Sequence, residues 1–258
     1  MPVSNNKFSL ANRRYVVTGA SSGIGRAMAG HLAQAGADVI LVARRESELQ
    51  RAVDEINTEN ERARYVVADL GQREQLAQIA ARCKSVAQDT NIDGIINAAG
   101  INLREPVETV SIESWDSTLN LNLSVPFFFT REFVPEMRER GFGRVINIAS
   151  LQSTRAFPNG MAYGASKAGI CQLTRAMAEA WSRYGICCNA IAPGFFPTEL
   201  TAPVFDDNDK REWAAKQTTI GRNGRMDDLL GVTVFFASEA CSYITGQTLA
   251  IDGGFTAR

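Results

Sequence analysis

The sequence contains almost no histidine, because His31 is the only one in 258 residues. A single histidine excludes a metal site built from several imidazoles. It also excludes a Ser-His-Asp hydrolase unless His31 itself is the base. His31 lies at helical spacing from Met28 and Ala35, so we interpret it as a structural residue and expect no bound metal.

Cysteine is scarce, and neither sign of charge is in excess. The five cysteines are odd in number and include no Cys-x-x-Cys pair, which excludes a disulfide framework and favours buried thiols. The formal net charge of -1 provides no basic surface for a nucleic acid. No apolar run reaches the roughly 18–20 residues that cross a bilayer, and the polar start lacks a secretory signal. We therefore expect a cytoplasmic protein with neither a nucleic-acid nor a membrane partner.

Short apolar runs alternate with longer amphipathic stretches along the whole chain. This alternation predicts an α/β fold: a single doubly wound Rossmann-type domain over 1–258, with a seven-stranded parallel sheet and helices on both faces. The longest irregular stretch, about 193–219, suggests a substrate lid at about 194–219. The expected strands are 15–17, 39–42, 65–67, 95–96, 145–148, 189–191 and 248–251. The expected helices are 24–35, 46–58, 72–87, 111–140, 160–184 and 226–237.

A glycine-rich turn follows the first expected strand. Gly19, Gly23 and Gly25 stand where the chain must turn sharply and enter a helix. Such a turn exposes backbone N–H groups and directs the positive end of the helix at a phosphate. We therefore predict a dinucleotide site here, although a simple tight turn is the plainer alternative.

The end of the second expected strand bears on the choice of coenzyme. Enzymes that use NAD usually place an acid there to bind the adenosine ribose. This chain has Arg44 and Arg45 instead, and a guanidinium can hold a 2′-phosphate through paired hydrogen bonds. The sequence favours NADP, with NAD as the alternative; two solvated arginines would be the functionless interpretation.

Tyr163 and Lys167 stand four residues apart on an expected helix, so their side chains share a face. A nearby ammonium favours the phenolate form of tyrosine and lowers its pKa, which would suit proton transfer. We interpret the pair as acid–base machinery.

These motifs together resemble the short-chain dehydrogenase/reductase family. Gly19-x-x-x-Gly23-x-Gly25, Asn97-Ala-Ala-Gly100, Tyr163-x-x-x-Lys167 and Pro193-Gly194 occur in the order of the family, over almost the whole chain. The resemblance implies an oxidoreductase acting on CH–OH groups. For Asp69, an adenine contact and a helix N-cap are equally open. Besides the two arginines, the implied coenzyme-binding residues are Gly19, Ser21, Ser22, Gly23, Ile24, Gly25, Asp69, Leu70, Asn97, Ala98, Gly100, Tyr163, Lys167, Pro193, Gly194, Phe195 and Thr198.

The resemblance also implies catalytic roles. Ser150 matches the serine that binds the substrate oxygen, with Ser153 as the second choice, and Tyr163 matches the proton donor. Lys167 matches the residue that lowers the tyrosine pKa and binds ribose. Asn122 matches an asparagine that holds a proton-relaying water; Asn120 lies nearby, and a structural asparagine bonded to backbone stays open.

The substrate is predicted less directly. Ser150, Gln152, Asn159 and Phe195 are candidates to line the site, and Arg104 is a candidate to pair with a substrate carboxylate. The whole-chain pattern is most similar to the gluconate 5-dehydrogenase branch of the family, which implies a small-molecule ketone or alcohol substrate. Reduction of a 3-oxoacyl carrier protein or another small ketone, and a non-enzymatic nucleotide-binding regulator, are the alternatives.

The expected helices at 111–140 and 160–184 imply, by the resemblance, a homodimer or homotetramer. Apolar candidates for the contact are Phe127, Phe128, Phe129 and Trp181. Internal packing of the same side chains is the alternative.

Overall fold

The computed structural model describes residues 6–58, 61–87 and 91–257 and shows one parallel sheet. The strand order is β3-β2-β1-β4-β5-β6-β7, and every adjacent pair is parallel. The predicted fold class and all seven strands are confirmed. Because β1 is flanked by β2 and β4, the winding direction reverses at β1 and leaves a crevice at the carboxyl ends of the strands. The strands are β1 Arg14–Thr18, β2 Asp38–Ala43, β3 Ala63–Val67, β4 Gly94–Asn97, β5 Gly143–Ile148, β6 Ile186–Pro193 and β7 Thr248–Ile251.

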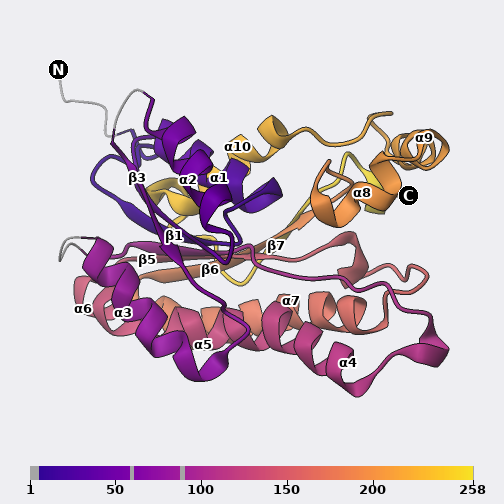
Figure 1. The fold of residues 1–258 in the computed structure, drawn as a ribbon. Helices are drawn as coiled ribbons and strands as arrows, with labels where there is room; N and C mark the ends of the chain where they lie inside the picture. The colour runs from indigo at the N-terminus through magenta and orange to yellow at the C-terminus, as the bar shows by residue number, and fades with distance from the viewer. Residues whose placement is uncertain (1–5, 59–60, 88–90, 258) are drawn as a thin grey trace.

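Helices cover both faces of the sheet (Figure 1). On one face lie α1, α2 and α10, and on the other lie α3 to α7; α8 and α9 gather at one end of the molecule. The helices are α1 Gly23–Gln34, α2 Glu46–Ile56, α3 Leu76–Val86, α4 Ile112–Leu119, α5 Val125–Arg131, α6 Val134–Arg140, α7 Met161–Trp181, α8 Ala202–Phe205, α9 Asn208–Gln217 and α10 Leu230–Ala237.

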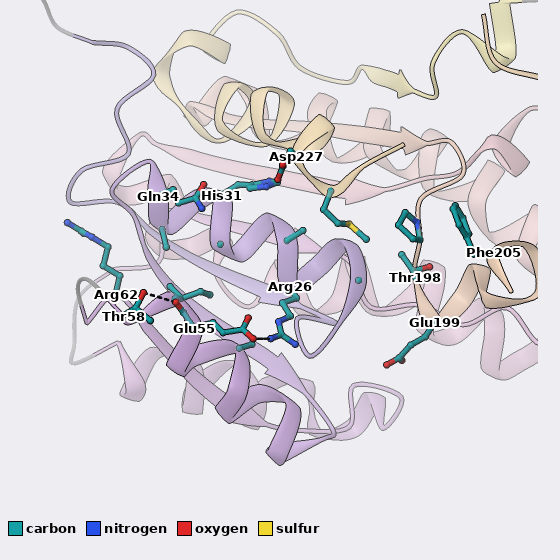
Figure 2. Close-up of a pocket in the computed structure, with 18 of the residues that line it drawn as sticks. Arg26, His31, Gln34, Glu55, Thr58, Arg62, Thr198, Glu199, Phe205 and Asp227 are labelled. Carbon is teal, nitrogen blue, oxygen red and sulfur yellow. Dashed lines mark hydrogen bonds and ion pairs between the residues drawn. The ribbon is translucent and has the colours of Figure 1, made fainter. Parts of the chain in front are cut away.

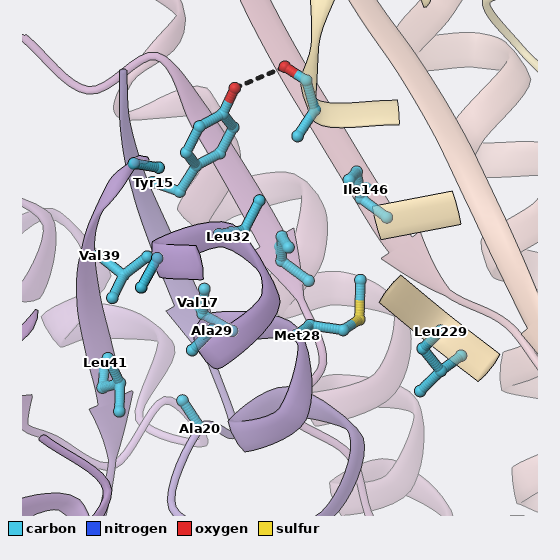
Figure 3. Close-up of a cluster of buried hydrophobic side chains, with 14 of the residues drawn as sticks. Tyr15, Val17, Ala20, Met28, Ala29, Leu32, Val39, Leu41, Ile146 and Leu229 are labelled. Atoms are coloured by element: carbon cyan, nitrogen blue, oxygen red, sulfur yellow. Dashed lines mark hydrogen bonds between the residues drawn. The ribbon is translucent and has the colours of Figure 1, made fainter. Parts of the chain in front are cut away.

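A hydrophobic core fills the space on each face of the sheet. Figure 3 shows part of the core under α1, where Met28 and Leu32 face Val17 and Ile146. Tyr15 lies at its edge, and its hydroxyl donates to the backbone carbonyl of Ala237. Tyr15, Val16 and Val17 of β1 are all buried. Both faces of this strand are therefore covered, as expected of a central parallel strand.

The predicted helix at 111–140 is interrupted, and its residues explain where. Ser111 caps α4 by accepting a hydrogen bond from the Ser114 backbone N–H at 3.0 Å. After a π-helical stretch at Asn120–Ser124, Pro126 and Pro135 stand in the first turns of α5 and α6. Proline lacks a backbone N–H, so it suits a first turn and disfavours a continuous helix.

The stretch from 193 to 219 is not irregular, which corrects the sequence-based expectation. It contains a 3-10 turn at Glu199–Thr201, followed by α8 and α9. Helix α9 has few apolar residues and only Ala214 buried. A polar helix of this kind lacks the apolar periodicity on which sequence-based helix prediction rests.

The scarce residues take structural positions. All five cysteines are unpaired, and Cys171 alone among them is not fully buried. His31 is buried in α1, and burial lowers its pKa while the charge of Asp227 opposes the shift. Within the described ranges, no helix is both long and apolar enough to cross a membrane.

Candidate active site

A cleft of about 800 Å³ lies at the carboxyl ends of the strands. It is lined by every coenzyme-binding residue implied by the sequence except Asn97, and by Ser150, Gln152 and Arg104. Parallel strands bring these segments together because their carboxyl ends meet at one edge of the sheet. The sequence-based prediction therefore located most of this cleft.

The glycine turn at the start of α1 is as tight as predicted. Gly19 and Gly23 have φ angles of +66° and +56°, a region that favours glycine. A Cβ on Gly25 would lie 2.5 Å from the Gly19 carbonyl oxygen. Ser22 occupies the N-cap position of α1 but makes no side-chain cap hydrogen bond. The helix N-terminus thus opens into the cleft without a side-chain cap, which fits a coenzyme phosphate.

Arg44 and Arg45 both line the cleft at the end of β2. The guanidinium of Arg45 donates to the two carboxylate oxygens of Glu199 at 2.9 and 3.0 Å. It also donates to the Ser22 hydroxyl at 2.9 Å. The contact with Ser22 holds Arg45 beside the glycine turn, where a 2′-phosphate would need an arginine.

Asp69 lies in the cleft, whereas Asn97 does not. Asp69 lines the cleft and accepts a hydrogen bond from the Gly71 N–H at 2.9 Å, and Gln72 is the cap of the following turn. The N-cap alternative for Asp69 is therefore wrong. Asn97 donates to Thr130 at 3.0 Å and to Asn147 at 2.9 Å. Its side chain joins β4 to β5 and α5 away from the cleft, which corrects its expected contact with coenzyme.

Tyr163, Lys167 and Ser150 come together as predicted. The first two lie on one face of α7, with the Lys167 Nζ 5.6 Å from the centre of the Tyr163 ring. Burial raises the pKa of the Tyr163 hydroxyl above its usual value, against the opposing effects of a hydrogen bond with Ser150 and the charge of Arg104. The expected lowering by Lys167 is not among these influences. The phenol is therefore held in its protonated form at neutral pH.

Lys167 is buried at the floor of the cleft, and burial lowers its pKa to about 8. Its Nζ donates to the Ile148 carbonyl oxygen at 2.6 Å. A Cβ on Gly100 would lie 3.7 Å from this nitrogen, an ordinary contact, but only 3.1 Å from the Oδ1 of Asn122, so Asn122 is the side chain that a larger residue would crowd.

Ser153, the second choice for the catalytic serine, does not line the cleft. Its hydroxyl donates to the Lys167 backbone carbonyl at 2.6 Å and accepts from the Ser150 N–H at 3.2 Å. Ser153 therefore positions Ser150 against α7, while Ser150 is the serine that faces the cleft.

Asn122 is fully engaged within the protein. Its Oδ1 accepts from the Ile101 N–H, and its Nδ2 donates to the Ile101 carbonyl, each at 2.9 Å. A third bond, of 3.1 Å, runs to the Ser166 hydroxyl. The structural interpretation of this side chain is the one that the geometry fits. Asn120 bonds instead to the Gly71 carbonyl at 2.7 Å.

On the substrate side, Gln152, Phe195 and Arg104 line the cleft. Arg104 has a left-handed backbone with φ of +55° and donates to the Leu200 carbonyl at 2.8 Å. Asn159 does not line the cleft; it is exposed with φ of +58°, so it serves a turn. This corrects its expected substrate contact.

The sequence-based analysis missed Trp213 and Glu199. Trp213 projects from α9 into the cleft and contacts Phe195 edge to face, with ring centroids 6.2 Å apart. Phe157 also lines the cleft and contacts Phe195 edge to face, which completes an aromatic wall of Phe157, Phe195 and Trp213. Phe255 packs against this wall from outside the cleft lining. A tryptophan in an otherwise polar segment was the available signal for Trp213; for Glu199, no sequence signal links it to an arginine 154 residues away.

A second cavity, of about 1070 Å³, lies on the outer side of α1 (Figure 2). Its wall includes His31 and Asp227 at one end and Thr198 and Glu199 at the other. Gly23, Thr198 and Glu199 line both cavities, so the start of the segment at 194–219 separates them.

Comparison with known proteins supports this arrangement. A sequence model described as "Enoyl-(Acyl carrier protein) reductase" matches residues 19–256. Gluconate 5-dehydrogenase of Gluconobacter oxydans is 38% identical, with 96% of each chain covered. A solved structure of a putative NAD(P)-dependent gluconate 5-dehydrogenase from Beutenbergia cavernae with bound NADP is 40% identical, with TM-score 0.92 and 98% and 100% of the chains covered. A gluconate 5-dehydrogenase from Burkholderia cenocepacia in complex with NADP and tartrate is 35% identical, with TM-score 0.92 and 98% of each chain covered.

Proposed function

Because the chain belongs to the short-chain dehydrogenase/reductase family, we propose that this oxidoreductase interconverts a secondary alcohol and a ketone on a sugar acid. NADP is the preferred coenzyme, and NAD is the alternative. The observation that carries the proposal is one cleft that joins the uncapped glycine turn to Ser150, Tyr163 and Arg104. The names of the similar proteins support a gluconate-type substrate.

The proposed chemistry assigns one task to each side chain. When bound, the nicotinamide ring supplies or accepts a hydride. In reduction, Ser150 holds the substrate oxygen and Tyr163, protonated at neutral pH, donates the proton to it. In oxidation, Tyr163 must first lose its proton, so that direction is favoured by higher pH. Lys167 binds the ribose hydroxyls, and the backbone at Pro193–Gly194 with Thr198 lines the nicotinamide end of the cleft.

Arg104 favours an acidic substrate. Arg104 and Tyr163 line the same cleft, so a substrate carboxylate paired with Arg104 would lie in the cleft that holds the reacting centre. The aromatic wall of Phe157, Phe195 and Trp213 would also accept an acyl chain, which keeps the carrier-protein substrate as the second candidate. An acidic carrier would need a cluster of free basic residues, and the arginines of α5 and α6 are engaged within the protein. Arg131 lies over the Phe128 ring, Arg138 stacks on Tyr184 at 4.0 Å, and Arg140 donates to the Ile92 carbonyl.

A panel assay tests the proposal. Consumption of NADPH or NADH is followed with 5-keto-D-gluconate, an acetoacetyl thioester and a small diketone. We expect fastest turnover with the keto acid and NADPH. Preference for the thioester would contradict the substrate, preference for NADH would contradict the coenzyme, and no turnover with any ketone would favour a nucleotide-binding regulator.

We also propose that residues 194–219 act as the substrate lid, and that the protein is a cytoplasmic homodimer or homotetramer. Phe195 and Trp213 support the lid, since both line the cleft.

The proposed assembly rests on apolar side chains of α5 and α7. Phe127 stacks on Trp181 and both stay partly buried, which supports an interface, whereas Phe129 is fully buried in the core. Five unpaired cysteines fit a reducing compartment. A monomer in light scattering at micromolar concentration would contradict the assembly.

A further inference from the structure

The ion pair between Arg45 and Glu199 joins two segments that are far apart in the sequence. The two terminal guanidinium nitrogens, Nη1 and Nη2, donate to the two carboxylate oxygens at 2.9 and 3.0 Å, in the paired geometry that arginine adopts with carboxylates and phosphates alike. The two side chains are 47% and 64% exposed, so water and dissolved ligands reach the pair.

The pair lies where the coenzyme's adenosine end is expected. Arg45 directly follows the first arginine after β2, and its guanidinium also contacts Ser22 of the glycine turn. Glu199 begins the 3-10 turn that opens the 194–219 segment, and it forms part of the cleft wall. A 2′-phosphate bound to Arg45 would therefore meet the carboxylate of Glu199 on the same guanidinium.

The two anions cannot share that guanidinium at low cost. A phosphate monoester at neutral pH and an ionised carboxylate repel each other at contact distance. Glu199 is ionised at neutral pH, because the hydrogen bond from Arg45 holds the pKa of its carboxyl below the usual value. NAD carries a 2′-hydroxyl at this position, so it brings no negative charge next to the Glu199 carboxylate.

We propose that Glu199 is a specificity-determining residue that competes with the 2′-phosphate of NADP for Arg45. The carboxylate occupies the phosphate-binding edge of the guanidinium until NADP displaces it, whereas NAD binds with the ion pair intact. Glu199 thereby weakens NADP binding selectively and narrows the preference between the two coenzymes. This inference rests on the proposed preference for NADP.

A double-mutant cycle tests it by direct binding. Dissociation constants for NADPH and NADH are measured by fluorescence, and those for 2′,5′-ADP and 5′-AMP by calorimetry, on the wild type, Glu199→Gln, Arg45→Ala and the double variant. An exposed arginine–carboxylate pair contributes up to about 1 kcal/mol, so we expect Glu199→Gln to tighten NADPH and 2′,5′-ADP by about three- to fivefold. NADH and 5′-AMP should change little, and the gain should vanish when Arg45 is already alanine.

The matched control is Glu212→Gln, which removes the same charge from the same segment at a residue outside the cleft lining. It should leave all four constants unchanged. Equal tightening by Glu199→Gln with and without Arg45 would overturn the proposal, because that pattern is general repulsion. The proposal would also be overturned if Glu199→Gln left the NADPH dissociation constant unchanged while Arg45→Ala weakened NADPH binding. In that case the assignment of Arg45 to the 2′-phosphate of NADP would still stand. If Arg45→Ala leaves the ratio of NADPH to NADH affinity unchanged, the assignment of Arg45 to the 2′-phosphate fails as well.

Discussion

The ammonium nitrogen of Lys167 donates a 2.6 Å hydrogen bond to the backbone carbonyl of Ile148. This contact fastens α7 to the end of β5 and so fixes the position of Tyr163, one turn earlier on the same face. Lys167 is only 5% exposed. The fold therefore keeps an ammonium group in a place where burial disfavours its charge.

That burial makes stability depend on pH. The Lys167 pKa is about 8 in the fold against 10.5 for an ordinary lysine. Below pH 8, Lys167 is charged in both the folded and the unfolded protein, and the folded protein bears the full free-energy cost of burying that charge. As the pH rises toward 10.5, folded Lys167 loses its proton while unfolded Lys167 keeps it, so the cost of burial disappears. We expect the free energy of unfolding of the wild type, relative to Lys167→Met, to rise by about 3 kcal/mol over that window. Urea unfolding of both proteins between pH 7 and 10.5 measures it, and a constant difference would contradict the buried charge.

Replacing Tyr163 tests the proton donor. Tyr163→Phe removes the hydroxyl that bonds to Ser150 and keeps the ring. We expect the rate of ketone reduction to fall by about 10²–10⁴-fold, with NADPH affinity, measured by fluorescence, nearly unchanged. Tyr184→Phe is the control, since Tyr184 packs under Arg138 away from the cleft. Retention of most of the rate in Tyr163→Phe would remove Tyr163 from the mechanism.

Replacing Arg104 tests recognition of a carboxylate. Loss of a charge-assisted pair worth roughly 1.5–3 kcal/mol should raise KM for a keto acid by about 10- to 100-fold in Arg104→Ala. KM for a neutral diketone should stay near that of the wild type. Arg26→Ala, at an arginine paired with Glu55 outside this cleft, is the control. Equal losses for acidic and neutral ketones would assign Arg104 to holding the Leu200 backbone instead.

Much of the site follows from local sequence patterns. The glycine turn is predictable because a sharp strand-to-helix turn requires positive φ angles, and Gly19 and Gly23 have them. The pairing of Tyr163 with Lys167 follows from helical spacing alone. Apolar runs of two to four residues likewise mark strands that are buried on both faces.

The remaining features depend on contacts between distant segments. Asn97 is next in sequence to Ala98, which lines the cleft, yet its side chain bonds to Thr130 and Asn147. The orientation of this side chain is set by buried polar groups on neighbouring elements. The raised pKa of Tyr163 comes chiefly from burial, which spacing to Lys167 does not reveal. Asn159 has a left-handed backbone conformation, which places its side chain outside the cleft lining.

Asn122 provides a test that separates positioning from proton relay. Its three hydrogen bonds hold Ile101 and Ser166, so Asn122→Ala removes the partner of two part-buried backbone groups of Ile101 and of the buried Ser166 hydroxyl. We expect the free energy of unfolding to fall by about 2–4 kcal/mol in urea titrations. Asn120→Ala, which loses a single bond to Gly71, should lose less. In the folded variant, KM should rise more than kcat falls, because Ile101 lines the cleft. A large drop in kcat at unchanged stability and KM would instead place this side chain in the proton path.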